Sequence, residues 1–191
     1  MAARRARDSA LLDAVEALPV QPYDGPLWRV VRDGRDPLIC SAVGGRWDDR
    51  SFDALYTSTK ADGAIAEMLF HVAQGQPVMP SLVRYRLFEL TASIAACVRV
   101  ATPDVLAALG LKIATFGRLS YAEREQEYPR TQEIAEAAYF QGRDGMMVPS
   151  ARSGHPNLVV FCDRAGPDAL GVASDRGLID WEAWKGTPLG Y

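Results

Sequence analysis

The stretch over 44–71 constrains the fold most, because a loop, a short strand and an amphipathic helix follow one another within it. Apolar residues recur at helical spacing over 61–73, which predicts a helix with one buried face. Glu67 lies at the edge of that face, where a carboxylate can border a cleft. A strand is predicted over 55–58, and the loop before it carries Arg46 behind a pair of glycines.

Three side chains in this stretch have complementary chemistry. Arg46, Tyr56 and Glu67 are a cation, an aromatic ring and a carboxylate, each on a different predicted element. A guanidinium can grip a phosphate through two parallel hydrogen bonds, and glycines let a ligand approach the backbone. A carboxylate can stabilise a developing positive charge. The three residues therefore predict a site for a phosphorylated substrate that reacts through a cationic transition state.

Five short motifs occur along the chain in the order found in one protein family. They are Leu27-Trp28-Arg29, Gly44-Gly45-Arg46-Trp47, Tyr56, Glu67, and the pair 148–151 and 157–160. In this combination the chain resembles the RES-domain family, named after its Arg, Glu and Ser, whose members are mostly bacterial toxins that consume NAD. The resemblance covers roughly residues 27 to 161. Asp48 stands where we expect Asn, which affects local turn chemistry only.

The resemblance implies an α+β fold similar to that of ADP-ribosyltransferases: a mixed core with a split, bent sheet, flanking helices and NAD in a cleft. It implies that Arg46 binds the pyrophosphate or an adjacent ribose, with Arg29 as a second candidate cation. Tyr56 would stack on the nicotinamide ring, and Glu67 would stabilise an oxocarbenium-like state. Ser150 would orient the ribose or the nicotinamide amide. No metal is implied.

Judged from the residues alone, these side chains also have simpler interpretations. Arg29 can be a solvated strand residue, and Glu67 a solvated helix glutamate. Ser150 can cap the turn after a strand predicted over 145–148. No Gly-x-Ser-x-Gly pattern surrounds Ser150, so a nucleophilic serine is not predicted. Trp47 is best interpreted as a packing anchor.

The reaction implied is cleavage of the nicotinamide–ribose bond of NAD, with transfer of ADP-ribose to a cellular protein target. The alternatives are an NAD glycohydrolase or phosphorylase, in which water or phosphate is the acceptor. A second alternative is a non-enzymatic binding module in which Arg46 and Glu67 form a structural ion pair. Because a toxin must be held inactive, the resemblance also implies an Xre-like antitoxin that blocks the cleft beside Arg46.

Composition argues against several other classes of protein. A net charge of -3 argues against general nucleic-acid binding, and no apolar run is long enough to span a bilayer. Asp8, Asp13 and Glu16 interrupt the segment after the basic N-terminus, so no signal peptide is predicted. Three widely spaced cysteines without a Cys-x-x-Cys pair predict reduced thiols rather than a disulfide or a zinc site. The chain is therefore predicted to be cytoplasmic.

The predicted organisation is one catalytic domain over 27–162, preceded by a helical appendage and linker over 1–26. A tail over 163–191 is predicted to pack on the same domain. No motif matches in 75–145, so contacts with a partner or target are unassigned there. Further predictions are a helix over 8–18, a linker over 20–26, strands over 83–90, 94–100 and 157–162, and helices over 104–109 and 131–142.

Overall fold

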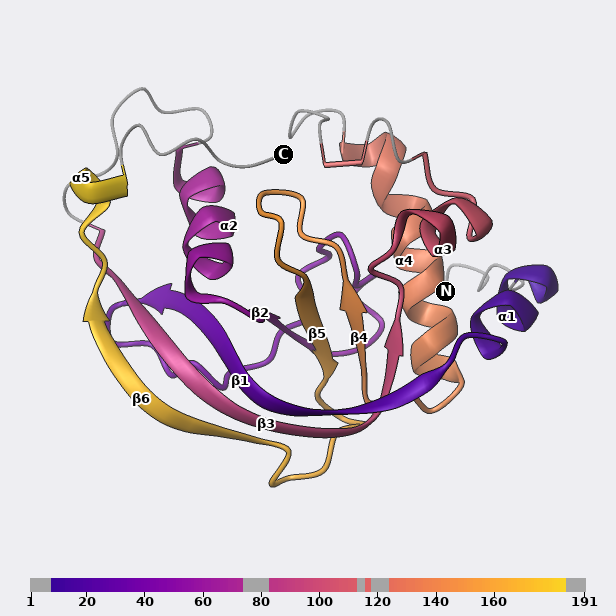
Figure 1. The fold of residues 1–191 in the computed structure, drawn as a ribbon, viewed down its shortest axis with the longest axis horizontal. Coiled ribbons are helices and arrows are strands. Elements are labelled where there is room, and N and C mark those ends of the chain that lie inside the picture. The colour runs from indigo at the N-terminus through magenta and orange to yellow at the C-terminus, as the bar shows by residue number, and fades with distance from the viewer. Residues whose placement is uncertain (1–7, 74–82, 113–115, 118–123, 185–191) are drawn as a thin grey trace.

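The computed structural model describes residues 8–73, 83–112, 116–117 and 124–184 and has a mixed α+β architecture (Figure 1). The predicted class, a sheet with flanking helices, is confirmed. The helices are α1 (Ser9–Glu16), α2 (Ala61–Ala73), α3 (Pro103–Ala108), α4 (Arg124–Phe140) and α5 (Trp181–Trp184). The strands are β1 (Val20–Arg32), β2 (Ala54–Ser58), β3 (Tyr85–Arg99), β4 (Gly145–Val148), β5 (Asn157–Phe161) and β6 (Leu170–Leu178).

The strands form a six-stranded sheet whose pairings close on themselves. Their order is β1-β2-β5-β4-β3-β6, and β1 also pairs with β3, so five strands form a circuit with β6 attached outside it. Only the pairing of β3 with β4 is parallel among the described strands. The long strands β1, β3 and β6 curve beneath the shorter β2, β5 and β4 (Figure 1). The ends of the short strands are thereby brought close to the helices.

Strand β1 begins at Val20, so the predicted linker over 20–26 is wrong. Proline has no N–H to donate, which argued against a strand here. The strand accommodates Pro22 at an irregularity in its register with β3. It pairs with β2 only at Trp28, so the half that contains Pro26 is paired on one side in the described part of the chain.

Two other predicted boundaries are also wrong. β3 is one strand where two were predicted, because the alternation of buried and exposed residues continues unbroken through Thr91, Ala92 and Ser93. Helix α4 begins at Arg124 rather than at 131, and it contains Pro129. The longer helix places residues before 131 within reach of the loop between β1 and β2.

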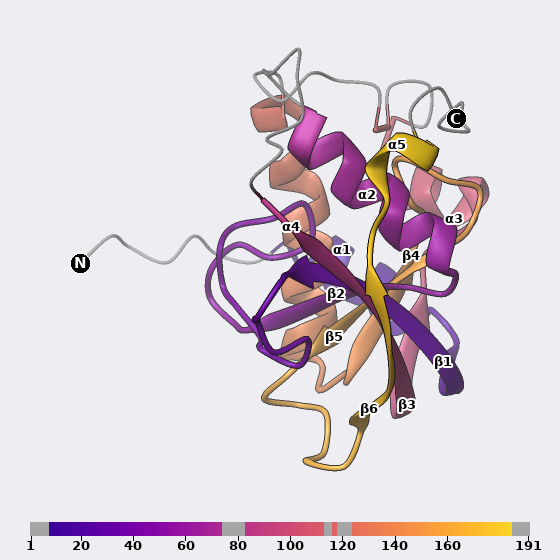
Figure 2. The ribbon, with the colours of Figure 1, turned by 90° about the vertical axis from the view of Figure 1, so that its left-hand side faces the viewer.

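Three clusters of buried side chains hold these elements together. The first contains Trp47 and Phe161 and joins α1 and α4 to one face of the sheet. The second, with Leu27 and Leu158, fills the space between the long and the short strands. The third, with Ile65, joins α2 to β1, and both views show α2 over the inner side of the curved strands (Figures 1 and 2). Trp47 is 2% exposed, which confirms its interpretation as a packing anchor.

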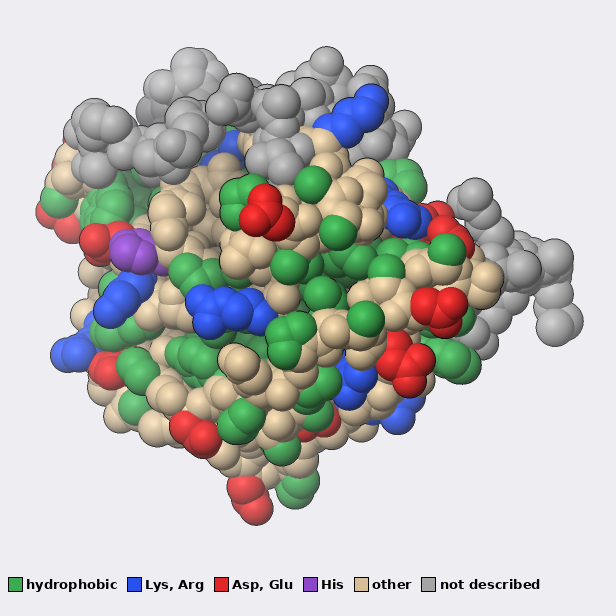
Figure 3. All heavy atoms as spheres, turned by 45° about the vertical axis from the view of Figure 1, so that its right-hand side comes forward, with side chains coloured by type: hydrophobic (Ala, Val, Ile, Leu, Met, Phe, Trp, Pro, Cys, Tyr) green, Lys and Arg blue, Asp and Glu red, His purple; other side chains and the backbone are tan. Residues whose placement is uncertain are grey.

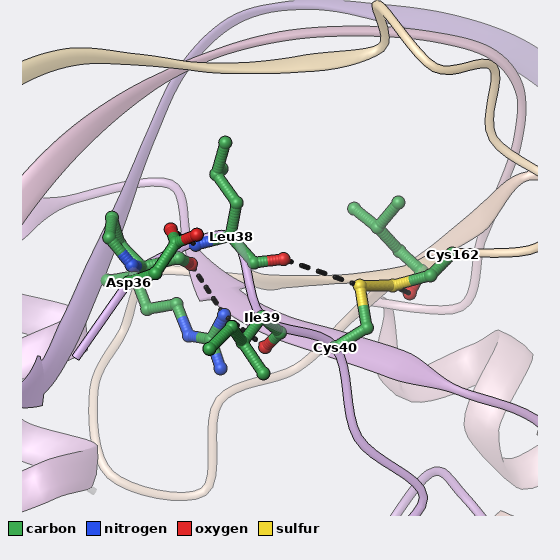
Figure 4. Close-up of a disulfide and its surroundings, with 8 residues drawn as sticks. Asp36, Leu38, Ile39, Cys40 and Cys162 are labelled. Carbon is green, nitrogen blue, oxygen red and sulfur yellow. Dashed lines mark hydrogen bonds between the residues drawn. A yellow bond between two sulfur atoms is a disulfide. The ribbon is translucent and has the colours of Figure 1, made fainter.

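Cys40 and Cys162 form a disulfide between the loop before β2 and the turn after β5 (Figure 4). The prediction of reduced thiols is therefore wrong for this pair. The fold brings together two cysteines that lie 122 residues apart, which their spacing in the sequence does not reveal. Cys97 is free and buried, and burial raises the pKa of its thiol to about 11, so this thiol is protonated and unreactive near neutral pH.

Within the described residues, no helix has both the length and the apolar character needed to cross a bilayer. Basic and acidic side chains are interspersed over the face that carries α1 and α4 (Figure 3). This face shows no extended patch of a single charge among the residues that are described.

Candidate active site

Glu67 projects from α2 to the end of the β4–β5 hairpin, where one of its oxygens accepts three hydrogen bonds. Oε1 accepts from Ser150 Oγ at 2.6 Å, Asn157 Nδ2 at 2.9 Å and the Ala151 N–H at 3.3 Å. All three donors are uncharged. No described residue donates to Oε2, so this second oxygen is the one that can face a ligand. We call Glu67, Ser150, Ala151 and Asn157 the carboxylate half of the site.

Ser150 is fully engaged by its neighbours. Its hydroxyl donates to Glu67 and accepts from the backbone N–H groups of Arg152 and Ser153, both at 3.0 Å. A hydroxyl has one proton and two lone pairs, so this set occupies all of them. Ser150 therefore caps the turn, which is the interpretation that the residues alone gave. It also orients Glu67.

The orientation of Asn157 follows from its partner. A carboxylate only accepts hydrogen bonds, so the amide must present its Nδ2 to Glu67. Its Oδ1 is then buried without a hydrogen-bond partner among the described residues. Asn157 begins β5 and pairs with Ser58 and Val148, which fixes its backbone from both sides.

Gly63 permits the close approach of α2 to this hairpin. A Cβ at this position would lie 2.3 Å from Ser58 Oγ and 3.1 Å from Ser153 Oγ. With a larger residue, either the Ser58 hydroxyl would have to rotate away or the helix, and with it Glu67, would have to shift from the strand ends.

Arg46 lies in the loop between β1 and β2, and its guanidinium rests over two aromatic rings. Its Cζ is 4.8 Å from the ring centroid of Phe116 and 5.2 Å from that of Tyr128. Both distances fall within the range of cation–π contacts. Both rings come from the segment in which the sequence shows no motif. We call Arg46, Phe116 and Tyr128 the guanidinium half of the site.

The backbone of the Arg46 loop is fixed by the fully buried Asp48. Its carboxylate accepts the N–H groups of Gly44 at 2.7 Å and Gly45 at 2.6 Å, and the hydroxyl of Tyr56 at 3.0 Å. Gln132 of α4 donates to the carbonyls of Gly45 and Asp48 at 2.8 and 3.0 Å. The residue that departs from the family pattern is thus the centre of the hydrogen bonds that hold this loop.

Tyr56 uses its hydroxyl for this loop. The hydroxyl donates to Asp48 and accepts the N–H of Trp47 at 2.8 Å. Burial, together with the neighbouring carboxylate, raises the pKa of Tyr56 well above its usual value, so the phenol is neutral at physiological pH. Its predicted stacking on nicotinamide concerns the ring and stays a prediction.

The two halves of the site are joined through Gly117. This residue follows Phe116 and lies so close to Ala151 that a Cβ on it would be 2.7 Å from the Ala151 Cβ. The buried Arg152 donates to the carbonyl of Gly117 at 2.5 Å, and its guanidinium lies 3.2 Å from the ring centroid of Phe70 on α2. A continuous set of contacts thus runs from Arg46 to Glu67.

Arg29 is not brought to Glu67. Its NH1 donates to the carbonyls of Pro37 and Ile39 at 2.6 and 3.0 Å, which fastens the start of the loop between β1 and β2. Its neighbours Trp28 and Val30 pack with α2, so alternation along the strand places Arg29 on the opposite face. Burial lowers the pKa of Arg29 to about 10, and the side chain is still charged at neutral pH.

Comparisons with known proteins agree with this architecture. The RES domain model matches residues 26–183. The chain belongs to the RES-domain family. In fold, it is similar to a chain in the crystal structure of the M. tuberculosis MbcT–MbcA toxin–antitoxin complex, with a TM-score of 0.78 and 22% identity over 94% of this chain and 97% of that one. No curated protein sequence matches significantly. The resemblance first seen in the short motifs is therefore confirmed at the level of the family.

Motif analysis of this RES domain finds Arg46, Tyr56, Glu67 and Ser150 but misses the residues that support them. Asn157 begins one of the motifs and Asp48 follows another, but the sequence assigned neither a role in the site, and no local signal marks the others. The described residues contain no group of three or more His, Cys, Asp or Glu side chains that could hold a metal ion. The supporting residues found by the structure alone are Phe116, Tyr128, Gln132 and Arg152.

Proposed function

We propose that this RES-domain protein is a toxin that cleaves the nicotinamide–ribose bond of NAD and transfers ADP-ribose to a cellular protein. The observation that carries the proposal is the convergence of three donors on one oxygen of Glu67. This arrangement fixes the carboxylate and leaves Oε2 for the substrate. Family membership and the similarity in fold to a chain of a toxin–antitoxin complex support the class of activity.

In the proposed reaction the bond between nicotinamide and ribose C1′ breaks, and its electron pair stays on the nicotinamide nitrogen. The pyridinium ring thereby becomes neutral, and positive charge develops on the ribose. Glu67 Oε2 stabilises that charge from a position fixed before the reaction begins, so little reorganisation is required. The acceptor then forms a bond to C1′ through a lone pair and loses a proton.

The other residues contribute position and binding. Arg46 binds the pyrophosphate, which suits a forked donor at the end of a hydrogen-bonded loop. Ser150 keeps Glu67 in place and lies where it can border the ribose. The Tyr56 ring would pack on nicotinamide while its hydroxyl stays in the loop. Arg29 supports the loop that carries Arg46 and is not assigned to NAD. NAD is a consumed substrate here, bound as in an ADP-ribosyltransferase-like cleft.

We further expect an Xre-like antitoxin to cover the Arg46 loop and so to block access to NAD. Purified toxin that kept full access to NAD in complex with its antitoxin would contradict this mode of inhibition. We also expect the protein to be located in the cytoplasm.

The alternative of a non-enzymatic binding module rests on an ion pair between Arg46 and Glu67. The described donors to Glu67 are all uncharged, which gives no support to that alternative.

The test is to incubate the protein, freed of antitoxin, with NAD labelled on the adenine side, with and without cell lysate. Release of nicotinamide with label on a protein band supports the proposal. Release with label only in small molecules indicates a glycohydrolase, or a phosphorylase if added phosphate captures the label. The Glu67→Gln variant is the matched control. Absence of release from the folded parent protein would overturn the enzymatic proposal.

A further inference from the structure

We propose that Phe116 and Tyr128 are positioning residues that hold the guanidinium of Arg46 for a diphosphate. This inference rests on the proposed function, because it assumes that the substrate presents a diphosphate to Arg46. It assigns a role to two side chains in the segment that carries no family motif. The observation behind it is that Arg46 Cζ lies 4.8 Å and 5.2 Å from the two ring centroids.

The loop and the end of the Arg46 side chain are contacted by different groups: hydrogen bonds act on the backbone of the loop, and the two rings contact the guanidinium. Asp48 and Gln132 contact main-chain groups of the loop. An arginine side chain has several rotatable bonds, and ordering it when a ligand binds costs conformational entropy. Two rings against the guanidinium order it before the ligand arrives.

The geometry of a guanidinium makes this support compatible with anion binding. Aromatic rings attract the cation over their faces, whereas a diphosphate is bound by the N–H groups at the guanidinium edge. The same group can therefore be held by Phe116 and Tyr128 and bind oxygen atoms in its own plane.

Phe116 also sets the position of Arg46 relative to the reacting centre. The next residue, Gly117, packs against Ala151, whose N–H donates to Glu67. Tyr128 lies on α4, one helical turn before Gln132, which holds the loop of Arg46. Through these neighbours, the two rings connect the guanidinium of Arg46 both to the carboxylate half of the site and to the loop that carries Arg46.

The test measures the binding of ADP-ribose by calorimetry, and the kinetics of NAD cleavage, in Phe116→Leu and Tyr128→Leu. Each should raise the dissociation constant for ADP-ribose about three- to tenfold and raise KM by a similar factor, with a smaller change in kcat. Phe116→Tyr and Tyr128→Phe keep the rings and should restore binding. The control variant is Arg164→Met. It removes a comparable contact, in which Arg164 Cζ lies 4.6 Å from the ring centroid of Tyr139, and it should leave ADP-ribose binding unchanged.

The decisive control repeats both leucine substitutions in an Arg46→Met background. If the rings act through Arg46, the leucine substitutions should not weaken ADP-ribose binding further in that background. If the rings have only a structural role, the substitutions should weaken binding in both backgrounds. An equal loss in both backgrounds, or unchanged ADP-ribose binding in Phe116→Leu and Tyr128→Leu, would overturn the inference. Failure of the parent to bind ADP-ribose would also overturn it.

The two proposals can fail separately. Normal NAD cleavage with unchanged KM in the leucine variants removes the positioning role and keeps the enzyme. The opposite outcome is a parent that binds ADP-ribose but does not cleave NAD. If the leucine variants then weaken ADP-ribose binding only when Arg46 is present, the positioning role stands and the proposed reaction does not.

Discussion

The two halves of the site are held by different kinds of interaction. In the carboxylate half, the reacting group itself is fixed, because three directional hydrogen bonds end on Glu67 Oε1. In the guanidinium half, hydrogen bonds fix the loop, and Arg46 itself rests on aromatic rings, which impose less direction. The carboxylate is therefore held by directional hydrogen bonds, whereas the faces of two rings hold the cation. This difference suits the proposed reaction, in which Glu67 places a fixed negative charge beside ribose C1′ and Arg46 binds a flexible diphosphate.

The largest expected effect tests the carboxylate half. Glu67→Gln keeps the size of the side chain and an oxygen that can accept from Ser150, but it removes the charge that stabilises the ribose cation. We expect kcat to fall about a hundred- to thousandfold with an unchanged unfolding temperature. Nicotinamide release measures the rate. Glu16→Gln, on the exposed end of α1, is the control, and equal losses in both variants would contradict the assignment.

The loop that supports the guanidinium half should respond mainly in stability. Asp48→Ala leaves the N–H groups of Gly44 and Gly45 and the Tyr56 hydroxyl without their acceptor, which should cost about 3–5 kcal/mol. Asp48→Asn keeps one acceptor oxygen and should cost about 1–2 kcal/mol. Urea unfolding gives both values. Asp49→Ala, at the exposed neighbour, should stay within about 0.5 kcal/mol, and a loss as large as that of Asp48→Ala would contradict the role of the buried carboxylate.

The disulfide should also support the guanidinium half more than the carboxylate half. Replacing Cys40 and Cys162 by serine should lower the free energy of unfolding by about 2–4 kcal/mol. We expect KM for NAD to rise more than kcat falls, because Cys40 lies in the loop that carries Arg46. A reductant should lower the stability of the parent and leave the double variant unchanged. Insensitivity of the parent to reductant would refute the bond.

A smaller effect is expected when one donor of the carboxylate half is removed. Asn157→Ala deletes a single hydrogen bond to a charged acceptor, while Ser150 and Ala151 keep theirs. We expect kcat to fall about tenfold, with KM nearly constant. A change confined to KM would mean that Asn157 binds substrate rather than fixing Glu67. Steady-state kinetics of nicotinamide release separate the two outcomes.

An effect of similar size is expected at Tyr56, and it depends on pH. Tyr56→Phe removes the bonds to Asp48 and Trp47 and should cost about 1–2 kcal/mol near neutral pH. The folded state raises the pKa of Tyr56, so the phenol stabilises the fold below its unfolded pKa of about 10. Above that pH the advantage of the parent should shrink by up to about 1.4 kcal/mol per pH unit. A difference that stayed constant from pH 7 to 11 would contradict this assignment.

The sequence predicts the carboxylate half better than the guanidinium half, and the reason is physical. The helix that carries Glu67 follows from local periodicity, and Ser150 follows from a motif at the end of a strand. The rings of Phe116 and Tyr128 occupy no motif, and Gln132 reaches a carbonyl 87 residues away. Contacts of this range depend on how α4 lies against the sheet, which no local pattern encodes.

The misassigned strand and cysteines have the same origin. The prolines of β1 predicted a linker, but tertiary pairing with β3 outweighs their local preference and places Pro22 at an irregularity. The cysteines gave no local sign of pairing. In both cases the deciding partner is distant in sequence.

The disulfide has a topological consequence. The chain from Cys40 to Cys162 is a covalent ring, and all members of both halves of the site lie on that ring. Under oxidising conditions a single cut in the backbone between these cysteines would release no fragment, so both halves would stay tethered. Strands β1 and β6, which border β3 on either side, lie outside the ring and are joined to it through one peptide connection each. A nicked protein should therefore migrate as one chain until a reductant is added, and as two afterwards.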